Sequence, residues 1–201
     1  MEQIKSYIET LTETVNQLPV GRIAQVVEIL QAARLSRRKI FIMGNGGSAS
    51  TASHFVCDLA KNTRHPGLPH FRVIGLTDNM AIFSAYANDE GYENVFATQL
   101  ANLVEAGDIV IAISASGNSA NVLKAVEEAR NHAAVTIGFT GFDGGRLGSL
   151  VDVQVHVNSH IIEHVEDIHL ALEHMIVKTL KDTANEDAEF SVATEKEPAV
   201  G

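Results

Sequence analysis

Cysteine, basic residues and long apolar runs are all scarce in this sequence. A single cysteine among 201 residues excludes a framework of disulfides within the chain and is typical of the reducing cytoplasm. No apolar run approaches the ~20 residues that a membrane-spanning helix needs. The first residues, MEQIKSYIET, lack the basic and apolar segments of a secretion signal. Fifteen basic residues against 25 acidic ones give a net charge of −10, which argues against a nucleic-acid-binding surface. We therefore expect a cytoplasmic protein that binds neither membranes nor nucleic acids.

Acidic residues gather in the last 20 positions of the chain. Positions 182–201 hold six acidic residues and one lysine without an apolar period, so we predict a disordered, solvated tail there. The remaining residues, 1–181, are long enough for one compact α/β domain with a proper core, but hardly for two. This body is closer to neutral than the whole chain, which permits an anionic small molecule as its ligand.

Short runs rich in β-branched residues alternate with helical patterns along the body. The strand-like runs are KIFIM, FRVIGL, DIVIAIS, AVTIGFT and DVQVHV, and the helical patterns cover about 48–61, 79–87, 92–104, 118–132 and 161–181. Apolar residues at helical spacing predict two further helices before the first strand. Apolar strands separated by helices indicate an α/β fold, a three-layer αβα sandwich around a five-stranded parallel sheet. In such sheets ligands bind beyond the carboxyl ends of the strands, near a reversal of strand order.

Two of the predicted strands end in loops rich in glycine and serine, GNGGSAS at 44–50 and ISASGNSAN at 113–121. Glycine lets the backbone approach a ligand closely, and Ser48 stands where the next helix begins, beside free backbone N–H groups. The second loop supplies Ser114, Ser116 and Ser119 and another helix start. Hydroxyls and N–H groups without a fixed lysine suit a phosphomonoester. The alternative is a pair of ordinary strand–helix turns.

Two of the predicted helices carry histidines and carboxylates at helical spacing. His54 and Asp58 are four residues apart, so they project from one face of their helix. Glu166 and His174 are eight apart and also roughly aligned. A carboxylate and an imidazole from each of two helices would hold Zn²⁺ or a similar ion. The alternative is that these are solvated residues on surface helices.

Taken together, these motifs resemble the SIS (sugar isomerase) domain family, and within it the phosphoheptose isomerases. The resemblance is carried by GNGGSASTASHFVCDL, ANDEGYENVF, GDIVIAISASGNSANVLKAV, TGFDGGRLGSLVDVQVHV and VEDIHLALEHMI. It implies a flavodoxin-like sheet, a homotetramer packed through the N-terminal helices, and active sites between subunits. It also implies a sugar-phosphate site, which takes in Asn45, Gly46, Gly47, Ser48, Asn88, Asp89, Ser114, Ala115, Ser116, Ser119 and Glu166.

The resemblance further implies that Asp58 and His174 are catalytic, and that a divalent metal, Zn²⁺ or another ion, is held by His54, Asp58, Glu166 and His174. The sequence departs from the family pattern around this site. Aspartate stands at 58 in place of glutamate and glutamate at 166 in place of glutamine. Ala115 replaces a threonine and Asn62 an arginine. Because these changes gather around one site, they keep a different sugar phosphate open as the substrate.

The reaction implied is the isomerisation of sedoheptulose 7-phosphate to D-glycero-D-manno-heptose 7-phosphate through a cis-enediol. Asp58 is the expected base on carbon, and His174 serves the oxygens. Two alternatives stay open. One is an isomerase of another phosphosugar, and the other is a non-catalytic SIS protein that binds a sugar phosphate or a protein partner. The presence of both Asp58 and His174 favours an enzyme.

Overall fold

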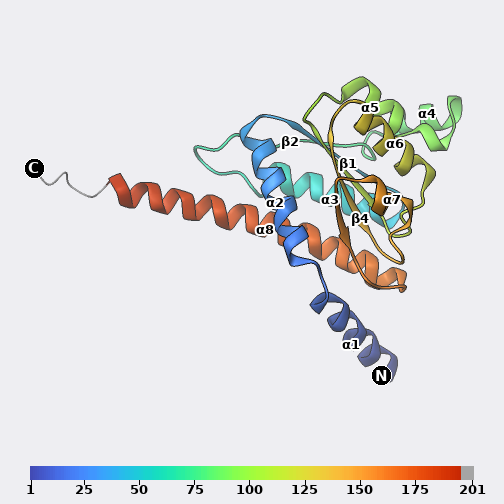
Figure 1. The fold of residues 1–201 in the computed structure, drawn as a ribbon, viewed down its shortest axis with the longest axis horizontal. Helices are drawn as coiled ribbons and strands as arrows, with labels where there is room; N and C mark the ends of the chain where they lie inside the picture. Colours follow the sequence, from blue (N-terminus) through green and yellow to red (C-terminus); the bar gives the residue numbers. More distant parts are fainter. Residues whose placement is uncertain (196–201) are drawn as a thin grey trace, which may run out of the picture.

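The computed structural model describes residues 1–195 and the side chains of residues 1–184 (Figure 1). Its strands are β1 (Lys39–Gly44), β2 (Arg72–Gly75), β3 (Ile109–Ser114), β4 (Val135–Thr140) and β5 (Val153–His156). Its helices are α1 (Glu2–Asn16), α2 (Val20–Leu35), α3 (Gly47–Lys61), α4 (Met80–Asp89), α5 (Ala97–Leu103), α6 (Ala120–Asn131), α7 (Gly145–Leu150) and α8 (Ile162–Glu195), with a short 3₁₀ turn, η1 (Tyr92–Asn94).

All five predicted strands are confirmed, and they form one parallel sheet in the order β2-β1-β3-β4-β5. The register places Ile42 beside Ile111, and Ile111 beside Ile137. After β1 the chain passes through α3 to one edge of the sheet, and β3 begins the run toward the other edge. The strand order therefore reverses between β1 and β3, where the two glycine-rich loops follow these strands.

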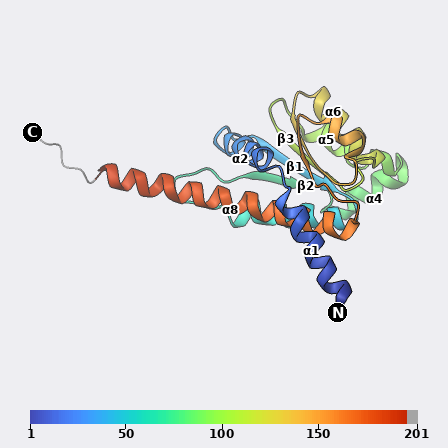
Figure 2. The same cartoon turned by 60° about the horizontal axis from the view of Figure 1, so that its bottom comes forward.

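Successive residues of each central strand feed opposite layers of the core, as the pleat of a strand requires. In β1, Ile40 and Ile42 pack in a cluster with α2, α3 and α8, whereas Phe41 and Met43 pack in a second cluster with α5, α6 and α7. Figures 1 and 2 show these groups of helices on the two sides of the sheet. The predicted three-layer α/β sandwich is confirmed.

Two elements differ from the sequence prediction. Helix α7, in a glycine-rich stretch, was not predicted. Helix α8 continues through 182–195, where a disordered tail was predicted, and Ala184 on it is buried. The domain boundary at 181 stays a prediction, and residues 196–201 lie outside the described part of the chain.

Helix α1 extends away from the sheet and meets the body through α8 (Figures 1 and 2). Its apolar residues Ile4 and Ile8 are 65% and 56% exposed in the single chain. Exposing an apolar stripe to water is unfavourable, so this face of the helix is a candidate for contact with another surface. Within residues 1–195, no helix has both the length and the apolar character needed to cross a membrane.

Candidate active site

The two glycine-rich loops meet at one pocket of about 300 Å³, at the carboxyl ends of β1 and β3. The pocket contains most of the predicted sugar-phosphate residues together with three apolar ones. Its lining is Asn45, Ser48, Ile113, Ser114, Ala115, Ser116, Ser119, Phe142, Ile162 and Glu166. The sequence therefore identified two loops that the fold brings together, at the reversal of strand order where ligands of such sheets bind.

A pair of asparagines ties the two loops to each other. Asn45 Nδ2 donates to Asn121 Oδ1 at 2.9 Å, and Asn121 Nδ2 donates back to Asn45 Oδ1 at 2.8 Å. The hydroxyl of Tyr92 donates to the same Asn45 oxygen at 2.9 Å. The sequence analysis missed Asn121 and Tyr92 as site residues. Asn121 lies at the end of the second loop motif, which was the available signal.

The pocket has hydroxyls and helix N-termini as its anion-binding groups. Helix α3 starts at Gly47 and α6 starts at Ala120, directly after the two loops. Free N–H groups and the positive end of the helix dipole favour an anion at such positions. Ser114 Oγ and Ser119 Oγ lie 3.3 Å apart within the second loop. Among the residues that the structure describes, neither lysine nor arginine lines this pocket.

Glycine is required twice where the first loop enters α3. Gly46 has φ +55°, a conformation that side chains with Cβ rarely adopt. Gly47 lies so close to Glu166 that a Cβ at this position would overlap the Glu166 carboxylate. The glycines therefore allow Glu166, from α8, to lie against the first turn of α3.

Asn88 and Asp89 do not line this pocket. They lie exposed at the end of α4, where Asn88 Nδ2 donates to Asp89 Oδ1 at 2.7 Å. Gly46 lines a smaller neighbouring hollow of about 120 Å³ with Met80, Phe83 and Tyr92 among its other residues. The roles of Asn88 and Asp89 in binding substrate stay predictions.

A second group of polar side chains lies farther along α3 and α8. His54 and Asp58 from α3 meet Glu173 and His174 from α8, and one ligand atom of each lies within 4.8 Å of the other three. His54 Nε2 lies 3.4 Å from His174 Nε2 and 3.7 Å from Asp58 Oδ2. Asn62 Nδ2 donates to Asp58 Oδ1 at 2.7 Å and so orients that carboxylate.

Three of the four predicted metal ligands are brought together here, and Glu166 is not part of this group. It lines the pocket described above. Glu173 stands in the group instead, and the sequence analysis had not singled it out. Its position is in phase with other buried residues of α8, namely His169, Ile176, Val177 and Leu180. A carboxylate within an apolar helical stripe was the signal that could have found it.

Burial of one member of this group, Glu173, has the largest effect on its pKa. The side chain of Glu173 is fully buried, and both of its carboxylate oxygens lack a hydrogen bond within the described residues. Burial, and then the negative charge of Asp58, raise the pKa of the Glu173 carboxyl to about 8. Two imidazoles and two carboxylates fit a divalent ion such as Zn²⁺, because imidazole nitrogens and carboxylate oxygens are among the ligands that this ion takes in proteins.

Comparisons of the sequence and the fold with known proteins identify the family of this chain. The chain matches the SIS domain family over residues 2–141. It is 38% identical over 186 residues to the phosphoheptose isomerase of Geotalea daltonii, covering 90% of this chain and 95% of that protein. It is 35% identical over 172 residues to the probable phosphoheptose isomerase of Thermoplasma acidophilum, covering 86% and 94%. The solved structure of a phosphoheptose isomerase from Francisella tularensis matches with a TM-score of 0.82 at 32% identity, covering 90% of this chain and 97% of that one. The chain therefore belongs to the SIS domain family, and within it to the group of the phosphoheptose isomerases.

Proposed function

We propose that the protein is an aldose–ketose isomerase that interconverts sedoheptulose 7-phosphate and D-glycero-D-manno-heptose 7-phosphate. The observation that carries this proposal is the placement of two different sites along one pair of helices. Ser48 and Glu166 line the pocket, whereas His54, Asp58 and His174 lie farther along α3 and α8. Eight residues of helix separate Glu166 from His174, a rise of about 12 Å.

This separation suits a substrate whose phosphate and carbonyl group lie far apart. From ordinary bond lengths, the reacting end of an extended seven-carbon sugar lies roughly 10 Å from the phosphorus atom at its other end. A three-carbon sugar phosphate spans roughly half of that distance. The spacing therefore supports a long-chain phosphosugar, with the phosphate in the pocket and the reacting carbons near His174.

In this proposal the two loops hold the phosphate. Hydroxyls of Ser48, Ser114, Ser116 and Ser119 donate to its oxygens, and the N-termini of α3 and α6 stabilise its charge. Glu166 supplies a carboxylate rather than a donor, so we assign it to the hydroxyls of the sugar, which can donate to it.

Two side chains move the protons of the reaction. Asp58 removes the proton from C1 of the ketose and returns it to C2, while His174 carries the proton between O2 and O1. Asn62 holds the Asp58 carboxylate through the hydrogen bond described above. A divalent ion, when bound by His54, Asp58 and His174, supplies positive charge that stabilises the negative charge of the enediolate. A carboxylate that ligates the ion is a weaker base, so Asp58 would have to exchange between these roles.

We further infer that the ion is Zn²⁺, and that the protein works in the cytoplasm as a homotetramer. Zn²⁺ is supported by the mixture of imidazole and carboxylate donors in the group. A tetramer is supported by the exposed apolar residues of α1, which a second chain would cover.

The test is isomerisation of sedoheptulose 7-phosphate in D₂O, followed by NMR at C1 and C2, with and without added Zn²⁺. We expect an aldose to form with deuterium entering at C1 or C2. A shorter phosphosugar, such as a pentulose 5-phosphate, is the matched competitor and should react at least 10-fold more slowly. Faster conversion of the shorter sugar would point to another substrate. Binding of the heptulose without any conversion would point to a non-catalytic sugar-phosphate binder.

A further inference from the structure

Apolar side chains form part of the pocket to which we assign the phosphate. They are Ile113, Ala115, Phe142 and Ile162. Ile113 and Ala115 are buried in the core, whereas Phe142 is half-buried and Ile162 is 41% exposed. Phe142 and Ile162, which we call the apolar wall, therefore keep surface that a ligand can cover. A phosphate group is bound by hydroxyls and N–H groups and gains nothing from such surface, so the wall fits another part of the ligand.

The backbone of Phe142 adopts a conformation that is uncommon for a bulky residue. Its φ is +52°, in the left-handed region. Gly144 N donates to Gly141 O at 2.8 Å, which closes a four-residue turn with Phe142 at its first central position. Turns with a positive φ at this position favour glycine, asparagine or aspartate. Because glycine would fit there without strain, the presence of a large ring indicates a use for that ring.

Neighbouring segments hold Phe142 at the pocket. Phe142 N donates to Ser159 O at 2.9 Å, which ties the turn to the segment before α8. Gly141 N donates to Ala115 O at 2.9 Å, which ties the turn to the second glycine-rich loop. The Phe142 ring lies 5.9 Å from the His160 ring at an interplanar angle of 73°, the edge-to-face arrangement that aromatic rings prefer. The ring is thus fixed beside the loop that carries the phosphate-binding serines.

Ile162 adds a second member of the apolar wall from α8. It lies one turn before Glu166, so the two side chains share a face of the helix, and both line the pocket. The preceding residue, Ile161, is also 41% exposed, but it lines a separate cavity between α1 and α8. Of these two isoleucines, only Ile162 lines the pocket, which gives a matched pair of positions for an experiment.

We propose that Phe142 and Ile162 determine specificity for the carbon chain next to the phosphate. They contact the C–H groups of the carbons that follow the ester oxygen, and this contact removes apolar surface from water. The pocket of about 300 Å³ accommodates more than a phosphate alone, because small-molecule sites start at roughly this volume. A phosphate ester gains the contact and inorganic phosphate does not, so the pocket discriminates against the free anion. This role rests on the proposed function only in placing the phosphate of a phosphosugar in this pocket.

The test compares three ligands by isothermal titration calorimetry on the full chain, at about pH 8, where phosphate monoesters are dianions. The ligands are sedoheptulose 7-phosphate, glycerol 3-phosphate and inorganic phosphate. For the wild type we expect glycerol 3-phosphate to bind at least about fourfold more tightly than inorganic phosphate, the factor that corresponds to the burial of one CH₂ group.

Four variants separate the apolar wall from its surroundings. Phe142→Ala should weaken binding of both esters at least about fivefold and change the Kd of inorganic phosphate less than about twofold. Phe142→Leu should lose less affinity, because it keeps apolar surface at the same place. Ile162→Ala should weaken the esters selectively, whereas its matched control Ile161→Ala should bind all three ligands as the wild type does. Damage to the phosphate loop itself would instead weaken esters and inorganic phosphate by the same factor.

Phe142→Gly separates the ring from the strained backbone. Glycine relieves the strain at positive φ, so the Tm of Phe142→Gly should exceed that of Phe142→Ala, while both variants lose the same affinity for the esters. The proposal is overturned if the wild type binds glycerol 3-phosphate no more tightly than inorganic phosphate, if Phe142→Ala weakens both by the same factor, or if Ile161→Ala behaves as Ile162→Ala does. Failure of the proposed function gives a different result. Sedoheptulose 7-phosphate would then not be converted, while the selective loss of glycerol 3-phosphate binding in Phe142→Ala would still support the role of the wall.

Discussion

Asp58 illustrates how a short carboxylate is held in place by its own helix. Asn62, one turn later on α3, donates to one of its oxygens, and His54, one turn earlier, faces the other. Residues four apart on a helix lie on the same face, so this arrangement follows from the local sequence. The contact with α8 does not, because it depends on how the two helices pack.

Our first prediction concerns the two residues assigned to proton transfer. Asp58→Asn and His174→Ala should each lower the turnover of sedoheptulose 7-phosphate at least about 100-fold, because each removes a group that moves a proton. Circular dichroism should show an unchanged fold.

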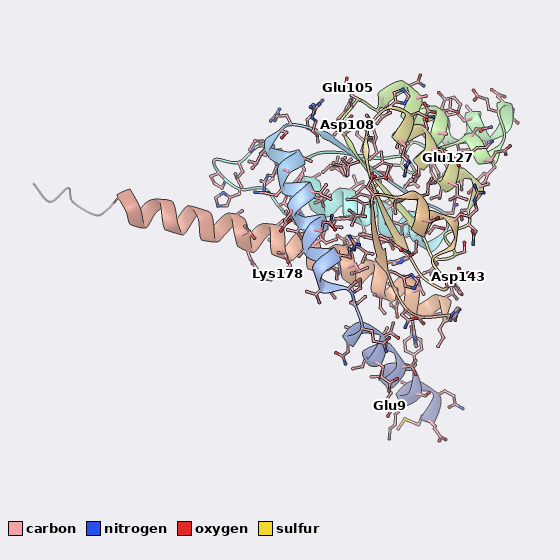
Figure 3. All side chains as sticks on the ribbon, in the orientation of Figure 1. Glu9, Glu105, Asp108, Glu127, Asp143 and Lys178 are labelled. Carbon is pink, nitrogen blue, oxygen red and sulfur yellow. The ribbon has the colours of Figure 1, made fainter. Side chains whose placement is uncertain are left out.

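The control for these two variants is Glu127→Gln. Glu127 pairs with Arg146 on the exposed side of α6, and Figure 3 shows it at the periphery of the molecule, away from α3 and α8. Turnover of this control should match the wild type. Near-normal turnover in Asp58→Asn or His174→Ala would remove that residue from the mechanism.

A second residue-scale prediction concerns His169, which is 1% exposed and packs beside Phe139. Burial lowers the pKa of its imidazole to about 4. Between pH 6.5 and 4 the unfolded chain therefore binds a proton that the folded protein does not, so stability falls as the pH drops through this window. Between pH 7 and pH 5 this one residue should cost about 2 kcal/mol of the free energy of unfolding.

Urea unfolding at the two pH values, in chelator, measures this effect. His169→Gln should lose less stability than the wild type on going from pH 7 to pH 5. The control is His70→Gln, because His70 is exposed and meets water in both states. Equal losses in the wild type and in His169→Gln would contradict the prediction.

At the scale of elements, α3 and α8 carry most of the site, and their close approach depends on small residues. Gly47 permits the contact with Glu166 at the first turn of α3. The overlapping atoms belong to the end of a flexible side chain, so that chain can rotate away. A larger residue at 47 should therefore change the pocket more than the stability of the fold.

Gly47→Ala tests this element-scale argument. The free energy of unfolding should change by less than about 1 kcal/mol, because the helix gains from alanine while the contact loses. The KM for the sugar phosphate should rise several-fold as Glu166 is displaced. Gly21→Ala on α2 is the control, since a Cβ there meets no atom within 4 Å, and its KM should not change. A loss of several kcal/mol with an unchanged KM would show that the glycine serves packing alone.

Ser119 offers a prediction for the second loop. It precedes α6, yet among the contacts of residues 1–184 its hydroxyl makes no capping bond to that helix. Ser119→Ala should therefore cost little stability and should weaken phosphate binding about 10-fold or more, the value of one hydrogen bond to a charged group. The KM and the inhibition constant of inorganic phosphate should rise together. An increase in neither would place the phosphate elsewhere.

At the scale of the whole molecule, the single chain leaves one helix poorly covered. Helix α1 reaches beyond the sandwich, with Tyr7 donating to Asp167 of α8 at 2.6 Å and with Ile4 and Ile8 exposed (Figures 1 and 2). This hydrogen bond orients the helix. The exposed apolar side chains of Ile4 and Ile8 indicate that another surface covers them.

We therefore predict that Ile4→Asp combined with Ile8→Asp dissociates the protein. Sedimentation equilibrium should give the wild type a mass near four times the 21.6 kDa of one chain, and the double variant a smaller mass. Burying two new charges in an apolar interface is the physical reason. The control is Glu9→Gln on the same helix, which should keep the wild-type mass. A wild type that sediments as a monomer would contradict the tetramer.

The sequence by itself determined the type and order of most elements, because helical and strand periodicities are local. KIFIM and DIVIAIS were recognisable as buried strands, and the loops after them as related sites. The family was recognisable for the same reason, since its motifs are short and contiguous. Helix α7 was not predicted, because the glycines within it obscure the apolar periodicity of a helix.

Tertiary structure alone decided which distant side chains meet. Asn45 and Asn121 pair across 76 positions, and no local pattern specifies that contact. Glu166 and Glu173 lie two turns apart on one helix, so spacing along α8 did not reveal which of them reaches His54. The packing of α8 on α3 decides this, because it brings the Glu173 carboxylate within 4.8 Å of ligand atoms of His54 and His174, an approach that no local pattern specifies.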